Sequence, residues 1–204
     1  MLRQPFFFQS ERKGTVIMNS SLSNIVTPLL NWYHTYARTL PWRQSPSAYH
    51  IWVSEIMLQQ TRVEAVKSYY NRFTAELPTI ADLAACQEER LLKLWEGLGY
   101  YNRVRNMQKA AIQIMAQYHG EMPRSYEELL KLPGIGSYTA GAVASIAYGI
   151  PVPAVDGNVL RVITRITANY GDITKQNTKE EITKQLQAII PKQHAGDFNQ
   201  ALME

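Results

Sequence analysis

The 204-residue sequence predicts an all-α fold. No segment shows the sustained alternation of apolar and polar residues that marks a half-buried strand. Apolar residues instead recur at helical spacing between residues that begin or end helices. Two Gly-x-Gly turns, at 97–99 and 134–136, are typical of tight connections between packed helices. We therefore expect helices throughout and no sheet.

The composition fits an ordinary globular protein. Hydrophobic residues make up 46% of the chain, and 21 Lys+Arg against 17 Asp+Glu leave a net charge of +4. That charge is compatible with a polyanionic partner but does not require one. The single cysteine, Cys86, excludes an internal disulfide framework and a multi-cysteine metal site, and fits a reducing cytoplasm. No run of 18 apolar residues occurs, so no membrane span is expected.

The N-terminal region is expected to order only after about twenty residues. Residues 1–20 are interpreted as a disordered extension, with Met18 a candidate for the true start. Ser23 or Asn24 can then cap a first helix that runs to about Thr39.

A second helix is expected from about residue 48 to 73, and it carries Glu55 inside its apolar stripe. At 100° per residue, six apolar or aromatic residues fall within about 60° of Glu55: Ile51, Trp52, Leu58, Val66, Tyr69 and Tyr70. A carboxylate there should be costly to ionise, so its pKa should rise, as a general acid requires. The alternative is a glutamate satisfied by Arg62 or Gln59.

Three further helices are predicted in the middle of the chain, at about 80–86, 88–94 and 101–118. Gly120 ends the last of them. The turn at 97–99 separates the second from the third and can be read as one more helix junction.

Capping boxes mark two later helices. Ser125 with Glu128 predicts a short helix that stops at Pro133. The segment Thr178–Glu181 predicts a helix that continues to Ile190. A last helix should begin near Asp197.

The turn at 134–136 can bind an anion. Gly134 and Gly136 permit backbone angles that residues with side chains adopt only at a cost. The next helix begins at about Ser137, so its unpaired amides and positive dipole end face the same side, where a phosphate would fit. Taken alone, the motif is more often only a tight turn between packed helices.

A carboxylate opens the helix that follows. Residues 139–149 are nearly all small and suit a closely packed, buried helix. Pro151 and Pro153 force an extended link, after which Asp156 begins a helix that runs to about Tyr170. A carboxylate at a helix N-terminus is expected to stay ionised.

Three motifs together resemble the helix-hairpin-helix DNA glycosylases, specifically the adenine glycosylase branch. They are Leu132-Pro133-Gly134-Ile135-Gly136, Ala154-Val155-Asp156-Gly157-Asn158 and the stretch Trp52–Thr61. The likeness covers roughly residues 22–204. It implies one catalytic domain, residues 21–204, with two helical lobes around a cleft. The central lobe would span about 51–132 and the second lobe 22–50 plus 133–204.

The resemblance also implies a reaction and its residues. Glu55 would protonate N7 of a flipped-out adenine. Asp156 would stabilise the sugar cation left behind, either directly or through a transient covalent adduct. Tyr138 and Asn158 would support them through hydrogen bonds. The expected partner is double-stranded DNA in which adenine is mispaired with 8-oxoguanine or guanine.

DNA contacts are expected from several turns. Trp42 and Arg43 would lie close to the base pocket, although a tryptophan that plugs a helix junction explains Trp42 equally well. Tyr100 is a candidate wedge in the base stack, alongside Gln59 and Gln60. The other expected DNA-binding residues are Thr61, Leu132, Gly134, Gly136, Arg103 and Arg105.

The family that this sequence resembles binds a cofactor whose cysteine ligands are not in the sequence. Family members continue from Phe198–Leu202 into a four-cysteine loop that holds a [4Fe-4S] cluster, and many add a domain that reads 8-oxoguanine. This sequence has neither, so we interpret it as a C-terminally incomplete member that holds no metal. We expect the protein to be a monomer. We also expect it to lie in the cytoplasm, associated with the nucleoid, as in bacteria.

Two other functions remain open at this stage. One is a pyrimidine glycosylase with strand-nicking activity, like endonuclease III, which carries a lysine nucleophile where this chain has Tyr138. The other is a non-catalytic fragment that uses its hairpins only to bind DNA.

Overall fold

The computed structural model describes residues 22–44 and 47–204, and this part of the chain is helical without strands. The expected disordered extension, including Met18, lies outside the described residues. The all-α prediction is confirmed. The helices are α2 (Val26–Tyr36), α3 (Pro41–Gln44), α4 (Ala48–Leu58), α5 (Val63–Glu76), α6 (Ile80–Ala85), α7 (Glu88–Trp95), α8 (Asn102–Gln117), α9 (Tyr126–Leu129), α10 (Ser137–Tyr148), α11 (Gly157–Ile166), α12 (Gln176–Ile189) and α13 (Ala195–Met203).

The prediction of one long helix over 48–73 is wrong. The chain leaves the helical path after Leu58, passes through Gln60 with a positive φ of 59°, and starts α5 at Val63. Arg103 gives the physical reason, because its guanidinium donates hydrogen bonds to the carbonyls of Ile56 (2.7 Å) and Gln59 (2.6 Å). These bonds satisfy the last carbonyls of α4, so the helix can end there.

Some predicted helix starts also need correction. The N-cap of α2 is Ile25, without a side-chain bond, rather than Ser23 or Asn24. Helix α12 begins at Gln176, and Thr178 is buried inside it. Its N-cap is Lys175, so the Thr178 side chain is not at the helix start, where it could accept a capping bond. Helix α13 begins at Ala195, two residues earlier than expected.

Only one of the two hydrogen bonds of the predicted capping box at Ser125 forms. The Ser125 hydroxyl accepts a hydrogen bond from the Glu128 amide at 3.1 Å. The Glu128 carboxylate does not return to the helix start. It accepts from Tyr118 (2.6 Å) and Lys131 (2.5 Å), two donors that compete successfully for it.

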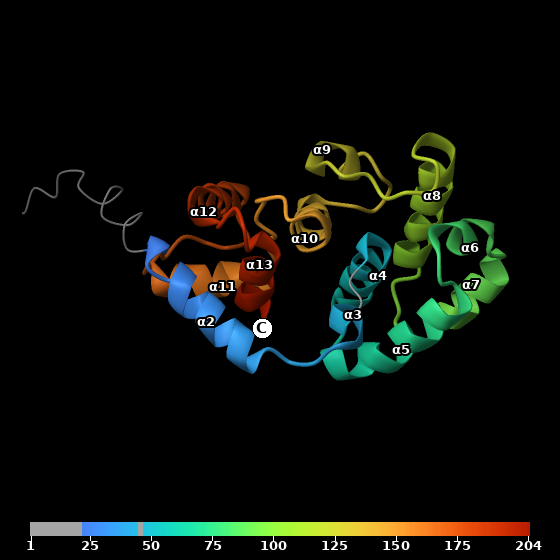
Figure 1. The fold of residues 1–204 in the computed structure, drawn as a ribbon, viewed down its shortest axis with the longest axis horizontal. Coiled ribbons are helices and arrows are strands. Elements are labelled where there is room, and N and C mark those ends of the chain that lie inside the picture. The colour runs from blue at the N-terminus through green and yellow to red at the C-terminus, as the bar shows by residue number, and fades with distance from the viewer. Residues whose placement is uncertain (1–21, 45–46) are drawn as a thin grey trace, which may run out of the picture.

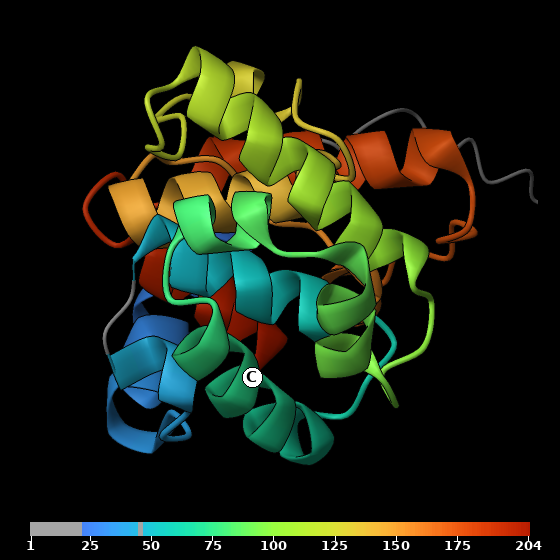
Figure 2. The same cartoon turned by 90° about the vertical axis from the view of Figure 1, so that its right-hand side faces the viewer.

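Two hydrophobic clusters divide the helices. The first gathers buried residues from Leu40 to Ala144, and the second joins Leu22 to residues between Val159 and Leu202. Figure 1 shows α2, α11, α12 and α13 on one side and α4 to α8 on the other. In Figure 2, α4 crosses the middle of the molecule. The lobe limits at 51 and 132 stay a prediction, since α10 contributes Ala140, Val143 and Ala144 to the first cluster.

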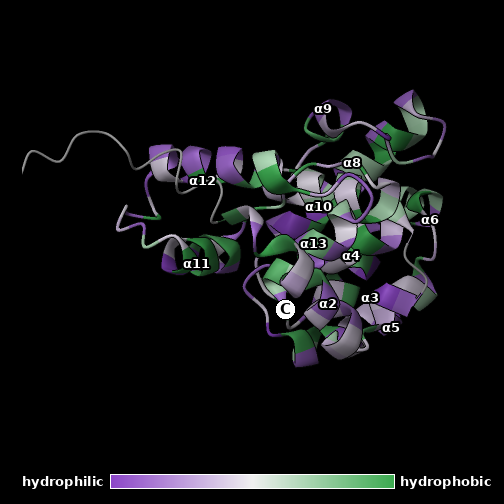
Figure 3. Ribbon diagram, turned by 60° about the vertical axis from the view of Figure 1, so that its left-hand side comes forward, coloured by the Kyte–Doolittle hydropathy of each residue, from purple (hydrophilic) through white to green (hydrophobic). Residues whose placement is uncertain are grey.

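The helices of the second cluster are amphipathic. In Figure 3, α11 and α12 carry both apolar and hydrophilic residues. Helix α11 buries Val159, Leu160 and Ile163, while α12 buries Ile182 and Leu186. None of the described helices is both long and apolar enough to cross a bilayer.

The link from α10 to α11 is held close to α10. A Cβ at Gly141 would lie 2.6 Å from the Pro153 carbonyl oxygen, so a glycine is required there. Asn199 is fully buried and fixes the same link, because its amide donates to Ser145 Oγ (2.7 Å) and the Val152 carbonyl (2.9 Å) and accepts from the Ala154 amide (3.1 Å). The position of Asp156 therefore depends on α10 and α13 together.

Candidate active site

A cavity of about 900 Å³ opens between the two groups of helices. Residues from α3, α4, α10, α11 and α13 line it, together with the 59–63 turn. It brings together most of the residues predicted from the sequence: Trp42, Arg43, Glu55, Gln59, Gln60, Thr61, Tyr138, Asp156 and Asn158. The other predicted residues, Tyr100, Leu132, Gly134, Gly136, Arg103 and Arg105, do not line it.

Glu55 projects from α4 into the cavity and is only 6% exposed. Burial raises its pKa to about 7, a hydrogen bond from Tyr138 opposes the rise, and the negative charge of Asp156 adds to it. The donor to Glu55 is thus Tyr138, not Arg62 or Gln59. A carboxyl group in this setting can hold a proton near neutral pH and release it to a base.

Tyr138 reaches Glu55 from the first turn of α10. Its hydroxyl donates to Glu55 Oε2 at 2.5 Å, and Met203 Sδ lies 3.1 Å from the same oxygen of Tyr138. Burial and the neighbouring carboxylate raise the pKa of Tyr138, so it stays a neutral donor. The bond engages one carboxyl oxygen of Glu55 and leaves Oε1 for the proton.

Asp156 is the N-cap of α11. Its Oδ1 accepts from the amides of Asn158 (2.9 Å) and Val159 (2.8 Å), and its Oδ2 accepts from Asn158 Nδ2 at 3.0 Å. Three donors and the positive end of a helix stabilise the charge of this carboxylate. The Asn158 side chain is held in turn by Arg161, which donates to its Oδ1 at 2.5 Å.

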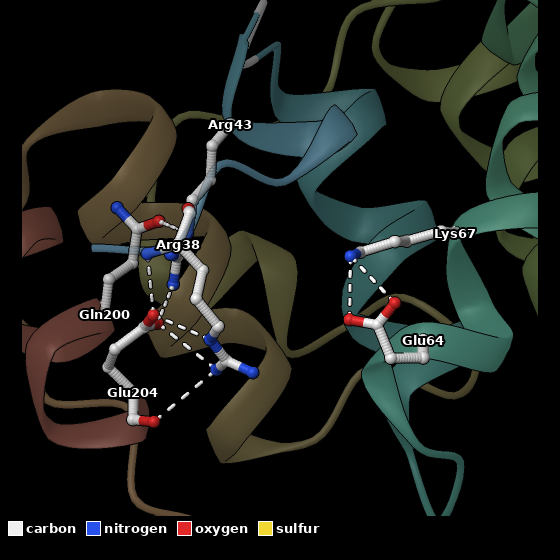
Figure 4. A network of polar contacts seen from close by, with 6 residues as sticks. All are labelled: Arg38, Arg43, Glu64, Lys67, Gln200 and Glu204. Atoms are coloured by element: carbon white, nitrogen blue, oxygen red, sulfur yellow. Dashed lines mark hydrogen bonds and ion pairs between the residues drawn. The ribbon is translucent and has the colours of Figure 1, made fainter. Parts of the chain in front are cut away.

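Arg43 is fixed by a polar network that sequence analysis did not predict (Figure 4). Its guanidinium donates to Gln200 Oε1 (3.0 Å), the Arg38 carbonyl (3.1 Å) and Glu204 Oε2 (2.8 Å). Arg38 donates to Glu204 Oε1 at 2.7 Å. Burial opposes the charge of Glu204, but hydrogen bonds from Arg38 and Arg43 outweigh burial and hold its pKa at about 2. The Glu64–Lys67 pair in the same view is a separate pair on α5.

Trp42 lies at a helix junction and at the cavity, and its place in a base pocket stays a prediction. It lines the cavity, and it is 6% exposed with its ring edge-on to Tyr70 at 5.4 Å between centroids. The residue therefore closes a helix junction and also forms one wall of the cavity.

Two strained turns lie next to each other beside the cavity. Gln60 and Tyr100 both have positive φ, 59° and 46°, and Tyr100 is 68% exposed. Arg103 joins the turns, since it bonds the Gln59 carbonyl and the Leu98 carbonyl (2.9 Å). The expectation that Arg103 reaches a phosphate is wrong, because its guanidinium is already bonded to backbone carbonyls.

Arg105 is placed differently from Arg103. Its Nε donates to Glu88 Oε1 at 2.7 Å in an exposed pair on α7 and α8. Such a pair is weak in water, so the Arg105 side chain can exchange partners.

The 132–136 hairpin lies against α8. Gly134 has a positive φ of 77°, and a Cβ there would lie 2.8 Å from Asn106 Cβ. Gly136 has an ordinary φ of −93°, with open space where a Cβ would be, so its predicted need for unusual angles is wrong. Leu132 is 2% exposed, because its side chain packs in the hydrophobic core. The expectation that this side chain contacts DNA is therefore wrong.

The hairpin leaves the start of α10 exposed. Gly136 caps α10 without a side-chain bond, and Gly134, Gly136 and Ser137 are exposed. The first amides of the helix can therefore face an external anion.

Sequence analysis missed the residues that hold the site in place: Arg38, Asn199, Gln200, Met203 and Glu204. In the resemblance, the stretch 198–202 is only the lead into a cofactor loop. The structure shows that Asn199 in this stretch is buried and acts as a positioning residue. Arg38 and Glu204 pair across 166 residues, which no local pattern reveals.

The residues present do not fit a [4Fe-4S] cluster. Such a cluster takes four cysteine thiolates, and the sequence contains Cys86 alone.

Comparison with known proteins identifies the family. Residues 53–192 match the model of the HhH-GPD superfamily of base excision DNA repair proteins. Adenine DNA glycosylases of Rattus norvegicus and Homo sapiens are each 43% identical to this chain over 185 residues, covering 86% of it and 36% and 34% of the relatives. That of Buchnera aphidicola subsp. Baizongia pistaciae is 41% identical over 177 residues and is covered over 50%.

The chain therefore spans about a third to a half of the length of the curated relatives it matches. The resemblance to adenine DNA glycosylases predicted from the motifs is confirmed by this similarity.

Solved structures agree with the family. A thermostable thymine-DNA glycosylase superposes with a TM-score of 0.80 at 27% identity, covering 91% of this chain and 85% of that one. A trapped endonuclease III–DNA covalent intermediate superposes with a TM-score of 0.76 at 26% identity, covering 91% and 84%. From its sequence match, its helical fold and its paired-carboxylate cavity, this chain belongs to the HhH-GPD superfamily of base excision DNA repair proteins.

Proposed function

We propose that this chain is the catalytic part of an adenine DNA glycosylase that hydrolyses the N-glycosidic bond of adenine mispaired with 8-oxoguanine or guanine. The observation that carries the proposal is the pairing of a buried Glu55, with a pKa of about 7, and a helix-capping Asp156 on one cavity. The identity to curated adenine DNA glycosylases supports the choice of base.

The proposed chemistry needs one carboxyl group in each protonation state. Cleavage of the bond between sugar and base leaves electrons on the departing base and a cationic sugar. Protonated Glu55 would give its proton to N7 of adenine, while the charged Asp156 would stabilise the sugar cation until water adds. Tyr138 and Asn158 would keep the two carboxyl groups oriented through the hydrogen bonds described above.

DNA would be held by turns around the cavity. A base inside a duplex is out of reach, so the nucleotide must be flipped out. The exposed Tyr100 and Gln60 would enter the base stack, and the amides after Gly136 would bind a phosphate. Thr61, Gln59 and the hairpin backbone at Leu132 and Gly134 would line the same DNA-facing side, with Arg105 free to pair with phosphate. The protein would bind as a monomer.

The residue at position 138 argues against strand-nicking activity. A lyase forms a Schiff base between an amine and the sugar, and tyrosine cannot form that bond. Borohydride should therefore trap no covalent complex between the protein and DNA that contains the mispair. A trapped complex formed by the purified protein would support the endonuclease III-type function instead.

A base-release assay tests the proposal against a DNA-binding role without catalysis. Duplexes with A opposite 8-oxoguanine, A opposite G and A opposite T would be incubated with excess protein, then treated with alkali to cut at abasic sites. A binding titration on the same duplexes runs beside it. We expect release from the two mispairs and not from A:T. A protein that binds the mispairs and releases no adenine would contradict the proposal.

A further inference from the structure

Three side chains to which the proposed reaction assigns no role have the arrangement of metal ligands, and one of them, Asp197, lines the cavity. His34 lies on α2, His194 directly precedes α13, and Asp197 lies in the first turn of α13. Asp197 Oδ2 is 3.0 Å from His34 Nε2 and 3.3 Å from His194 Nδ1. The three ligand atoms all lie within 4.8 Å of one another.

These distances suit a tetrahedral ion. Zinc binds imidazole nitrogen and carboxylate oxygen at about 2.0–2.2 Å, so neighbouring ligands of a tetrahedral site are about 3.3 Å apart. The two contacts to Asp197 already have about this length. One carboxylate oxygen faces both ring nitrogens, so all three ligand atoms point toward one place.

The ligand types select the kind of ion. Two imidazoles and one carboxylate suit zinc and other divalent transition metals, whereas Mg²⁺ and Ca²⁺ prefer oxygen ligands. Both histidine side chains are about half exposed, at 49% and 51%, and Asp197 is 37% exposed. An ion can therefore enter from solvent and keep water in its fourth position.

We propose that His34, His194 and Asp197 bind one divalent transition-metal ion, with zinc as the model ion, that clasps α2 to α13. The clasp would join His34 to Asp197 across 163 residues of sequence. Helix α13 carries Gln200 and Glu204, which hold Arg43 at the cavity. The ion would thus brace the wall of the cavity and take no part in the reaction.

Isothermal titration of the full chain with Zn²⁺ tests the site directly. We expect one ion per chain, with binding lost or weakened at least tenfold in His34→Gln and in His194→Gln. The matched control is His119→Gln, which changes an exposed histidine on a distant turn. A Cys86→Ser control removes the only thiol.

Thermal unfolding and hydrogen exchange test the clasp. Free Zn²⁺ at about 100 times Kd should raise the melting temperature by about 5–10 °C and slow amide exchange in α2, while Mg²⁺ should do neither. Unchanged Zn²⁺ affinity in both histidine variants, or no binding by a folded wild-type chain, would overturn the proposal. Zn²⁺ binding without slower amide exchange in α2 would contradict the claim that the ion links α2 to α13.

Discussion

At the scale of single residues, the proposed chemistry depends on two carboxyl groups in unlike surroundings. Glu55 is buried on α4 and receives one hydrogen bond, from Tyr138. Asp156 receives three hydrogen bonds at a helix N-terminus. Burial therefore favours the neutral form of Glu55, whereas Asp156 is oriented by its hydrogen bonds.

The pH dependence of the reaction should follow Glu55. Because the proton donor must be protonated, single-turnover excision should fall as pH rises through about 7.

The stability of the fold should depend on pH in the same direction. The pKa of Glu55 is higher in the folded than in the unfolded protein, so its contribution to stability is fully present below the unfolded pKa, near 4.5, and is lost as pH rises through about 7. The difference in stability between Glu55→Gln and wild type should thus shift in favour of the variant by up to about 3 kcal/mol between pH 5 and pH 8. Urea unfolding at pH 5 and pH 8 measures this difference, and an equal difference at both would count against the burial of an ionisable Glu55.

Asp156→Asn separates charge from capping. Asparagine caps helices as well as aspartate does, and its oxygen can keep the bonds from the amides of Asn158 and Val159. Its new amide would face the Asn158 amide, so stability should fall by at most about 1 kcal/mol. Loss of the charge should slow excision roughly 10²–10³-fold, by analogy with other electrostatic stabilisers of transition states. Near-normal excision would show that Asp156 acts only as a cap.

At the scale of elements, the site depends on where helices end. Helix α4 ends at Leu58 because Arg103 satisfies its last carbonyls, and the same guanidinium holds the 96–100 turn through the Leu98 carbonyl. One half-buried arginine therefore shapes both turns that carry the candidate DNA wedges, Gln60 and Tyr100.

A pair of arginine variants on α8 tests this role. Arg103→Ala should lower the free energy of unfolding by about 2 kcal/mol or more, because several carbonyls lose their donor. Arg105→Ala removes only an exposed ion pair with Glu88 and should cost less than about 1 kcal/mol. Urea unfolding of both compares them directly. Equal, small losses would mean that α4 ends without help from Arg103.

Local sequence signals predicted which helices exist better than the residues at which they begin and end. Glycine and proline positions were sufficient for the hairpin and for the link to Asp156, since these residues act on their own backbone. The long helix over 48–73 was wrong because the donor that ends α4 lies 47 residues away from Ile56. Leu132 and Gly136 were assigned DNA and backbone roles from a motif, but the motif does not show that the leucine fills the core.

The site itself was predicted where chemistry could be read from one stretch of chain. The carboxyl group in an apolar helix face and the carboxylate after two prolines both line the cavity. The network of Arg38, Arg43, Gln200 and Glu204 was missed because its members come from opposite ends of the chain, and a charge pair at that separation leaves no pattern.

At the scale of the whole molecule, α13 joins the two groups of helices. Its Asn199 holds the link to Asp156, and its end reaches Arg38 and Arg43 through Glu204. The cavity therefore keeps its shape only while α13 is docked against α10 and α2.

The carboxylate of Glu204 should make this docking sensitive to acid. Its folded pKa of about 2 lies below the unfolded value near 4.5, so its contribution is present above that value and is lost as pH falls toward 2. Wild type should lose up to about 3 kcal/mol more than Glu204→Gln between pH 6 and pH 2. Urea unfolding across this range measures the difference. Parallel pH profiles would show that the network adds nothing to stability.

Single-turnover excision by Glu55→Gln, measured with A opposite 8-oxoguanine beside a binding titration, tests the central claim most directly. Glutamine keeps the shape of Glu55 and its acceptor for Tyr138 but has no proton to give. The account predicts a rate at least roughly 10²-fold lower, and up to 10⁴-fold lower, with affinity for the mispaired duplex unchanged. A variant that binds the duplex and releases adenine at the wild-type rate would contradict the assignment of Glu55 as the proton donor.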